Sequence, residues 1–202
     1  MENLRECIFF CDLHDTFFSN DGTAEETRIN DIKVFVERLD VICEQLWINE
    51  MTFSFVSVEN ISVVEQAVKE IEPYLVGTKV VLGPQFSEKQ CLVRDSITKS
   101  WETKDAIDGK IFQMYDFIKS NIAMVNDVFY ADDSAIFQIM AHAFIKDKFS
   151  NINFVQLVPG GEGKVIAGEN VYSSLNLGLD GLNMTLENYI KNLSFDEQHR
   201  HK

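Results

Sequence analysis

Three aspartates follow directly after two apolar segments of the chain. Asp12 comes after residues 7–11, and the pair Asp132 and Asp133 comes after residues 127–131. Apolar, β-favouring segments that end in acidic residues are typical of buried parallel strands, whose C-terminal ends meet at one edge of a sheet. Carboxylates brought together there repel one another unless a cation joins them, and ligands that are all oxygen favour Mg2+ over softer metals. The spacing therefore predicts a magnesium site at that edge.

The residues around Asp12 also resemble a known motif. The sequence Asp12-Leu13-His14-Asp15-Thr16, preceded by apolar residues, resembles motif I of the haloacid dehalogenase (HAD) superfamily, whose common forms are D-L-D-D-T and D-L-D-G-T. The resemblance implies that Asp12 is a nucleophile and a magnesium ligand. His14 stands where the family has its second aspartate, the general acid/base. An imidazole can exchange protons near neutral pH, although it is larger than a carboxylate and cationic when protonated.

Further positions resemble the other motifs of this superfamily. Ser57 ends a second apolar segment, where motif II has a hydroxyl that binds the transferring phosphoryl group, but a Ser at the end of a strand also commonly begins an ordinary loop. Lys110 precedes Asp132 by about the interval usual for the motif III lysine, and Lys104 is its competitor. The pair Asp132 and Asp133 matches the D-D form of motif IV. The resemblance implies that Ser57 and Lys110 bind the phosphoryl oxygens.

Together these resemblances imply a magnesium-dependent phosphohydrolase, a phosphatase that acts on a phosphomonoester. By resemblance, Asp12 attacks phosphorus and forms an aspartyl-phosphate, which is covalent catalysis by a carboxylate. The cation would be held by the carboxylates of Asp12 and Asp132 and by the backbone carbonyl of His14. Asp133 would help to hold the cation, either directly or through a water molecule.

The histidine at position 14 leaves two other interpretations open. A HAD-like protein in which His14 marks lost catalysis would be an impaired binding or regulatory module. An unrelated α/β protein, such as a flavodoxin-like binding module, would share the sheet but would bind a ligand other than a divalent metal. A dehalogenase is disfavoured, because it does not need the metal-binding pair Asp132 and Asp133.

The segments that must position these residues alternate between strand and helix patterns. Apolar segments bounded by turn residues predict strands, and apolar residues at helical spacing predict helices between them. The alternation predicts an α/β fold with a three-layer α/β/α, doubly wound, mostly parallel sheet of the HAD-like Rossmannoid type. The predicted strands cover residues 7–11, 51–57, 79–83, 127–131 and 153–158, and the predicted helices cover residues 23–47, 62–74, 105–124, 134–146 and 184–193.

The chain is expected to form a single domain of residues 1–195, followed by a polar tail of residues 196–202. Only about thirty residues separate motif I from the next strand, which leaves no room for a cap domain. Residues 84–104 form either a small flap near the site or a solvated surface loop. They carry a local basic and aromatic cluster of Arg94, Lys99, Trp101 and Lys104. Nearly capless members of this superfamily often act on large substrates or borrow a lid from a partner.

Composition argues against several classes of partner. The chain has 202 residues and a formal net charge of −14, which opposes binding to long nucleic acid or anionic lipid, because Lys and Arg hold those partners. No apolar run approaches the roughly 18 residues of a membrane span, and the first residues do not resemble a signal peptide. Four cysteines without a zinc spacing indicate reduced thiols. We therefore expect a cytoplasmic protein, whose oligomeric state the sequence does not specify.

Overall fold

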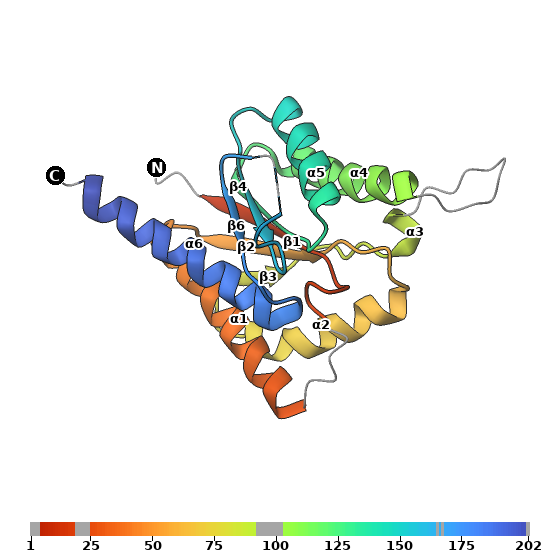
Figure 1. The fold of residues 1–202 in the computed structure, drawn as a ribbon, viewed down its shortest axis with the longest axis horizontal. Coiled ribbons are helices and arrows are strands. Elements are labelled where there is room, and N and C mark those ends of the chain that lie inside the picture. The colour runs from red at the N-terminus through yellow and green to blue at the C-terminus, as the bar shows by residue number, and fades with distance from the viewer. Residues whose placement is uncertain (1–4, 19–24, 92–102, 165, 167, 201–202) are drawn as a thin grey trace.

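Six parallel strands form the centre of the protein in the computed structural model (Figure 1). The structure describes residues 5–18, 25–91, 103–164, 166 and 168–200, with the backbone alone at 103–108 and 195–200. The strands are β1 (Glu6–Cys11), β2 (Glu50–Phe55), β3 (Val80–Leu82), β4 (Val125–Ala131), β5 (Asn153–Val158) and β6 (Val171–Ser173). Their order across the sheet is β3-β2-β1-β4-β5-β6, and every pair is parallel.

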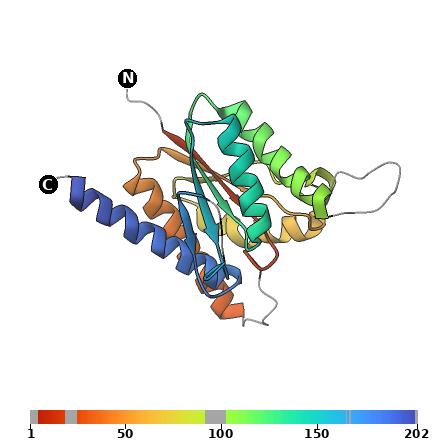
Figure 2. The same ribbon diagram turned by 45° about the horizontal axis from the view of Figure 1, so that its top comes forward.

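Helices cover both faces of the sheet and complete a three-layer arrangement (Figures 1 and 2). The helices are α1 (Glu25–Gln45), α2 (Ile61–Leu75), α3 (Glu88–Cys91), α4 (Thr103–Asn121), α5 (Ala135–Lys148) and α6 (Gly178–Arg200). Helices α1, α2 and α6 pack on one face, and α4 and α5 pack on the other. The chain runs from β1 outward to β3 and then crosses to β4, so the topological switch point lies between β1 and β4. The predicted doubly wound, Rossmann-like α/β fold is confirmed.

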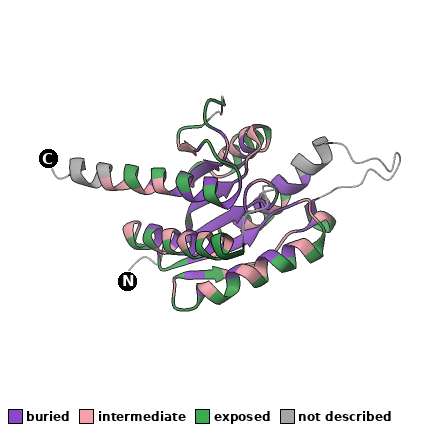
Figure 3. Ribbon diagram, turned by 60° about the horizontal axis from the view of Figure 1, so that its bottom comes forward, coloured by how far each residue is buried: buried purple, intermediate pink, exposed green. Residues whose placement is uncertain are grey.

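Strand β1 is buried on both faces, which explains its nearly continuous apolar sequence. Cys7, Phe9 and Cys11 pack in the core that α1, α2 and α6 cover, whereas Ile8 and Phe10 pack in the core under α4 and α5. Figure 3 shows the buried residues concentrated on the strands and on the inward sides of the helices. All four cysteines of the chain are free and buried. The central strand therefore anchors both halves of the core.

The boundaries of α1, α2, α4 and α5 agree closely with the predicted ones. Helix α2 begins after Asn60, whose side-chain oxygen accepts a hydrogen bond from the backbone N–H of Ser62 at 3.0 Å. This contact satisfies one of the N–H groups that every helix leaves free in its first turn. None of the helices in the described part of the chain is long and apolar enough to cross a membrane.

The C-terminal part of the fold differs from the prediction. Helix α6 begins at Gly178, well before the predicted range of 184–193, and it includes part of the expected polar tail. Glycine has a low helix propensity, so Gly178 and Gly181 obscure the start of the helix in the sequence. Gly181 is required there, because a Cβ atom would lie 1.7 Å from the backbone oxygen of Asn176. The sequence does not predict β6, because its three half-buried residues are too few to show an alternating pattern.

The segment of residues 84–104 is described only in part. It contains the short helix α3 and the first two residues of α4. Arg94, Lys99 and Trp101, which carry the prediction of a flap, lie outside the described residues. Lys104 lies in the first turn of α4, at a position described by its backbone alone. The proposed flap therefore stays a prediction.

Candidate functional site

The register of β1 and β4 brings two aspartates together at the C-terminal edge of the sheet. Cys11 pairs with Ala131 at the ends of these parallel strands, so the residues that follow, Asp12 and Asp132, lie next to each other. The backbone N–H of Asp12 donates to the carbonyl of Ala131 at 2.8 Å. Both aspartates are buried. The switch point, where open α/β sheets bind their ligands, therefore holds two buried carboxylates.

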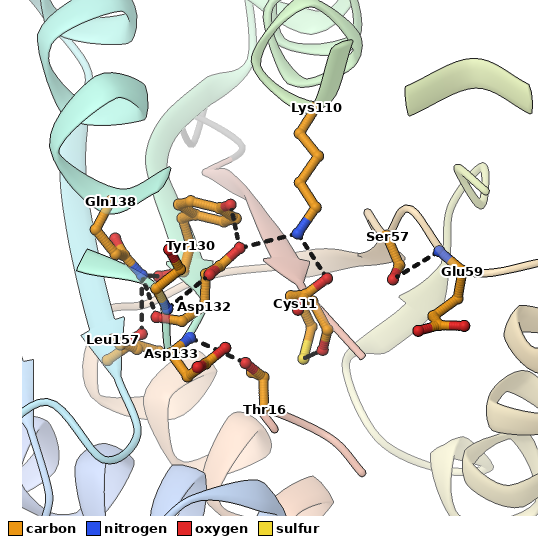
Figure 4. A network of polar contacts seen from close by, with 12 residues as sticks. Cys11, Thr16, Ser57, Glu59, Lys110, Tyr130, Asp132, Asp133, Gln138 and Leu157 are labelled. Carbon is orange, nitrogen blue, oxygen red and sulfur yellow. Dashed lines mark hydrogen bonds and ion pairs between the residues drawn. The ribbon is translucent and has the colours of Figure 1, made fainter. Parts of the chain in front are cut away.

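Lys110 joins these two carboxylates. Its Nζ atom lies 2.7 Å from Oδ1 of Asp12 and 3.1 Å from Oδ2 of Asp132. Figure 4 shows the lysine reaching from its helix toward Asp132. The Lys110 side chain is 2% exposed, and its Nζ atom lies 4.3 Å from the centre of the Phe137 ring on α5. One buried cation therefore balances part of the charge of two acids through charge-assisted hydrogen bonds.

The depth of Lys110 depends on a close approach between α3 and α4. A Cβ atom at Gly109 would lie 1.8 Å from the backbone oxygen of Cys91, the last residue of α3. Glycine lets two backbones approach this closely because it has no side chain. Helix α4 thus packs directly against α3, and Lys110, the next residue, reaches the ends of β1 and β4.

Burial and charge determine the protonation of this cluster. The pKa of Asp12 is raised to about 6, because burial disfavours its charged form more strongly than Lys110 favours it, and the charge of Asp132 adds to the rise. Burial alone would lower the pKa of Lys110, but the carboxylates of Asp12 and Asp132 outweigh burial and raise it. At neutral pH an ionised Asp12 therefore lies beside a charged Lys110.

Asp132 is held by further hydrogen bonds from β4 and the start of α5. The Tyr130 hydroxyl donates to Oδ2 at 2.6 Å, and the backbone N–H of Ser134 donates to Oδ1 at 2.9 Å. Gln138 on α5 donates from its side-chain amide to the backbone carbonyls of Tyr130, Asp132 and Leu157, at 3.1, 3.1 and 3.0 Å. These contacts, drawn in Figure 4, fix both the side chain of Asp132 and the backbone that carries it.

Asp133 completes a group of three acids. One carboxylate oxygen from each of Asp12, Asp132 and Asp133 lies within 4.8 Å of the others. The backbone N–H of Asp133 donates to Oγ1 of the buried Thr16 at 3.0 Å. The pKa of Asp133 is raised, chiefly by burial and then by the charges of Asp132 and Asp15. These ligand atoms are all oxygen, and Lys110 supplies only one positive charge for three acids, so the group could hold the predicted magnesium ion.

His14 and Ser57 are not members of this group of three acids, and their side chains make other contacts. The side chain of His14 is 60% exposed, and its Nε2 atom lies 3.4 Å from Oδ2 of Asp15. Ser57 is buried at the end of β2, and its hydroxyl accepts a hydrogen bond from the backbone N–H of Glu59 at 3.3 Å. Figure 4 places Ser57 on the opposite side of Lys110 from Tyr130. The structure therefore brings the predicted acids and Lys110 together, and leaves the His14 ring at the surface.

Sequence reasoning did not single out Tyr130 or Gln138. Tyr130 belongs to an apolar segment, which conceals its polar role, although residues two apart on a strand share a face, which puts it beside Asp132. Gln138 lies within an apolar helix and is fully buried. A polar residue at a buried helical position needs hydrogen-bond partners, and this requirement is the signal that could have identified it.

No family model matches this sequence, and no curated protein shows a significant similarity to it. Function is therefore inferred from the arrangement of Asp12, Lys110, Asp132 and Asp133 at the switch point of the sheet.

Proposed function

We propose that this protein is a magnesium-dependent phosphohydrolase of the HAD type, which acts on a phosphomonoester with Asp12 as its nucleophile. The observation that carries the proposal is the buried contact of Lys110 with both Asp12 and Asp132 at the switch point. Buried ion pairs add little net stability, because desolvation offsets their attraction. Charged groups concentrated at a ligand-binding edge therefore favour a chemical role.

Asp12 would carry the covalent step. One of its carboxylate oxygens attacks phosphorus while the bond from phosphorus to the leaving oxygen breaks, and protonated His14 donates a proton to that oxygen. Water then attacks phosphorus and gives a proton to His14, and the bond from phosphorus to the Asp12 oxygen breaks to release inorganic phosphate. A pKa of about 6 supports this role, because Asp12 is then mostly ionised at neutral pH.

Positive charge near the phosphoryl group would come from Lys110 and from a bound metal. Lys110 holds Asp12 in place and would bind a phosphoryl oxygen, as would the hydroxyl of Ser57. The carboxylates of Asp12 and Asp132 and the backbone carbonyl of His14 would hold Mg2+, and Asp133 would help to hold it directly or through a water molecule. When bound, Mg2+ supplies positive charge to the phosphoryl oxygens.

The exposure of His14, the net charge and the free cysteines bear on the substrate and on the cellular compartment. His14 is exposed to solvent, which favours a large phosphorylated substrate or a lid contributed by a partner. The net charge of −14 opposes a long nucleic acid as substrate. The four free cysteines fit the reducing cytoplasm.

The test is magnesium-dependent release of phosphate from a generic aryl phosphate. We expect activity in the presence of Mg2+, and a loss of at least about a hundredfold in Asp12→Asn, because an amide is a poor nucleophile. A metal-free reaction with excess chelator is the second control. Activity that persists in folded Asp12→Asn protein would contradict the assignment of the nucleophile.

The exposure of His14 favours a second candidate function, an impaired HAD-like module that binds but does not turn over its ligand. In the structure the His14 ring pairs with Asp15 at the surface. This candidate predicts that wild-type protein binds Mg2+ without releasing phosphate, and that His14→Asp gains activity. Turnover by wild-type protein would exclude it.

A further inference from the structure

The two oxygens of Asp132 differ in how many hydrogen bonds they accept. Oδ2 accepts from the Tyr130 hydroxyl at 2.6 Å and from Nζ of Lys110 at 3.1 Å. Oδ1 accepts from the backbone N–H of Ser134 at 2.9 Å. Each carboxylate oxygen has two lone-pair sites. Among contacts within the described residues, Oδ2 is therefore saturated, whereas Oδ1 keeps one site for a further ligand.

The Tyr130 hydroxyl is a fixed donor to this carboxylate. The residue is fully buried in the core between the sheet and helices α4 and α5. Its distance of 2.6 Å to Oδ2 is typical of a hydrogen bond from a hydroxyl to a charged carboxylate.

We propose that Tyr130 is a positioning residue, which holds Oδ2 of Asp132 away from the metal and thereby presents Oδ1 to Mg2+. This inference rests on the magnesium site of the proposed function. Tyr130 lies on β4 two residues before Asp132, so the strand itself sets the distance between them. Hydrogen bonds to a metal-ligating carboxylate commonly change metal affinity by about 10- to 100-fold.

A positioning role and a purely structural role predict different results. Mg2+ requires nearly ideal octahedral geometry, whereas Ca2+ accepts irregular arrangements of oxygen ligands. If the Asp132 carboxylate is held less firmly, Mg2+ binding should therefore weaken more than Ca2+ binding. A general loosening of the fold would weaken the binding of both ions alike and would lower the free energy of unfolding.

The experiment compares wild-type protein with Tyr130→Phe, which keeps the buried ring and removes the hydroxyl. Titration calorimetry gives the dissociation constants of Mg2+ and Ca2+, and urea unfolding with chelator present confirms that each variant folds. We expect about tenfold weaker Mg2+ binding in Tyr130→Phe and a change of less than about threefold for Ca2+. The matched control is Tyr189→Phe, which alters a buried tyrosine on α6 that packs against Phe129 on the other face of the sheet.

The possible results separate this inference from the proposed function. Unchanged Mg2+ affinity in Tyr130→Phe, while the wild-type protein binds Mg2+ and Asp132→Asn does not, would overturn the role of Tyr130 and leave the metal site in place. Equal weakening for both ions would also overturn it. A wild-type protein that binds no Mg2+ would overturn both the inference and the metal site of the proposed function.

Discussion

Lys110 carries one positive charge between two buried carboxylates. It is 2% exposed, and it contacts both Asp12 and Asp132 at hydrogen-bonding distance. The desolvation of charged groups offsets much of their attraction, so the presence of such a cluster adds little stability. The loss of one member is costly, however, because the remaining charges then stay buried without a partner. The cluster is therefore sensitive to single substitutions.

Replacement of Lys110 by methionine keeps most of the side-chain volume and removes the charge. Asp12 and Asp132 would then repel each other without a cation between them. We expect the free energy of unfolding, measured by urea denaturation in chelator, to fall by about 3 kcal/mol. In the double variant with Asp12→Asn, part of this loss is regained, because only one buried carboxylate remains.

The matched control for this prediction is Lys119→Met, which removes an exposed lysine from the same helix. We expect a change within about 0.5 kcal/mol for this surface substitution. Equal effects of Lys110→Met and Lys119→Met would show that the buried ion pairs do not matter for stability.

His142 on α5 predicts a pH dependence that is separate from the acid cluster. Its Nδ1 atom is buried without a hydrogen-bond partner among the described residues. Burial lowers the pKa of His142, Lys146 lowers it further, and Glu169 opposes the shift. The unfolded state then binds a proton more tightly than the folded state, so this residue costs stability as pH falls below about 6.5.

The test compares urea unfolding of wild-type protein and His142→Gln between pH 7.5 and pH 5.5. We expect the wild type to lose stability relative to the variant as the pH falls. Only the wild type has an imidazole here, and this imidazole binds a proton more tightly in the unfolded state than in the folded state. If the difference in the free energy of unfolding between the two proteins does not vary with pH, the lowered pKa of His142 would be contradicted.

At the scale of elements, the site depends on how closely two helices approach. Helix α4 contacts the end of α3 at Gly109, one residue before Lys110. Helix α5 is tied to the ends of β4 and β5 by Gln138, whose amide donates to three backbone carbonyls. These two helices thus fix the lysine and the aspartate of the cluster from the same side of the sheet.

Gly109→Ala tests the approach of α3 and α4. Helix propensity alone predicts that this change stabilises the protein by about 1 kcal/mol. The structure predicts the opposite sign, because the new Cβ atom would lie 1.8 Å from the backbone oxygen of Cys91. We expect the free energy of unfolding, measured with urea, to fall by about 2 kcal/mol.

Ser120→Ala serves as the control for Gly109→Ala, because Ser120 is exposed near the end of the same helix. We expect its effect on stability to stay within about 0.5 kcal/mol. If Gly109→Ala instead raised the free energy of unfolding, the close contact with Cys91 would not exist in solution.

At the scale of the whole molecule, polar networks lie at both ends of the sheet. The proposed catalytic group lies at the C-terminal ends of the strands. At the other end, Arg5 donates to Oδ2 of the buried Asp127 at 2.7 and 2.9 Å and to the carbonyl of Leu46 at 2.9 Å. Asn153 donates to Oδ1 of Asp127 at 2.9 Å. This second network ties β1, β4, β5 and the segment after α1 together.

Arg5→Met is expected to lower stability without changing Mg2+ binding. The variant leaves Asp127 buried with one charged partner fewer, so we expect the free energy of unfolding to fall by about 2 kcal/mol. Mg2+ affinity is expected to stay unchanged, because the proposed metal site lies at the opposite end of the sheet. Arg38→Met, which breaks a partly exposed pair with Glu187, should cost less than about 1 kcal/mol. A change in Mg2+ affinity on Arg5→Met would show that the two ends are coupled.

Local patterns in the sequence predicted most of the elements of this fold. The strand of residues 153–158 has the bounds that were predicted, since a short apolar segment between turn residues is a local signal. The start of α6 escaped prediction, because Gly178 and Gly181 weaken the helical pattern while the fold requires Gly181 beside Asn176. Tertiary packing here outweighs intrinsic propensity.

The sequence by itself determined that acids follow two buried strands, because each apolar segment and the acidic residues after it are consecutive in the chain. Only the tertiary structure decided which side chains meet. The register of Cys11 with Ala131 sets Asp12 beside Asp132, and Lys110 reaches Asp12 across 98 positions of the chain. Contacts between such distant residues depend on how strands pair and helices pack, and no local pattern specifies either.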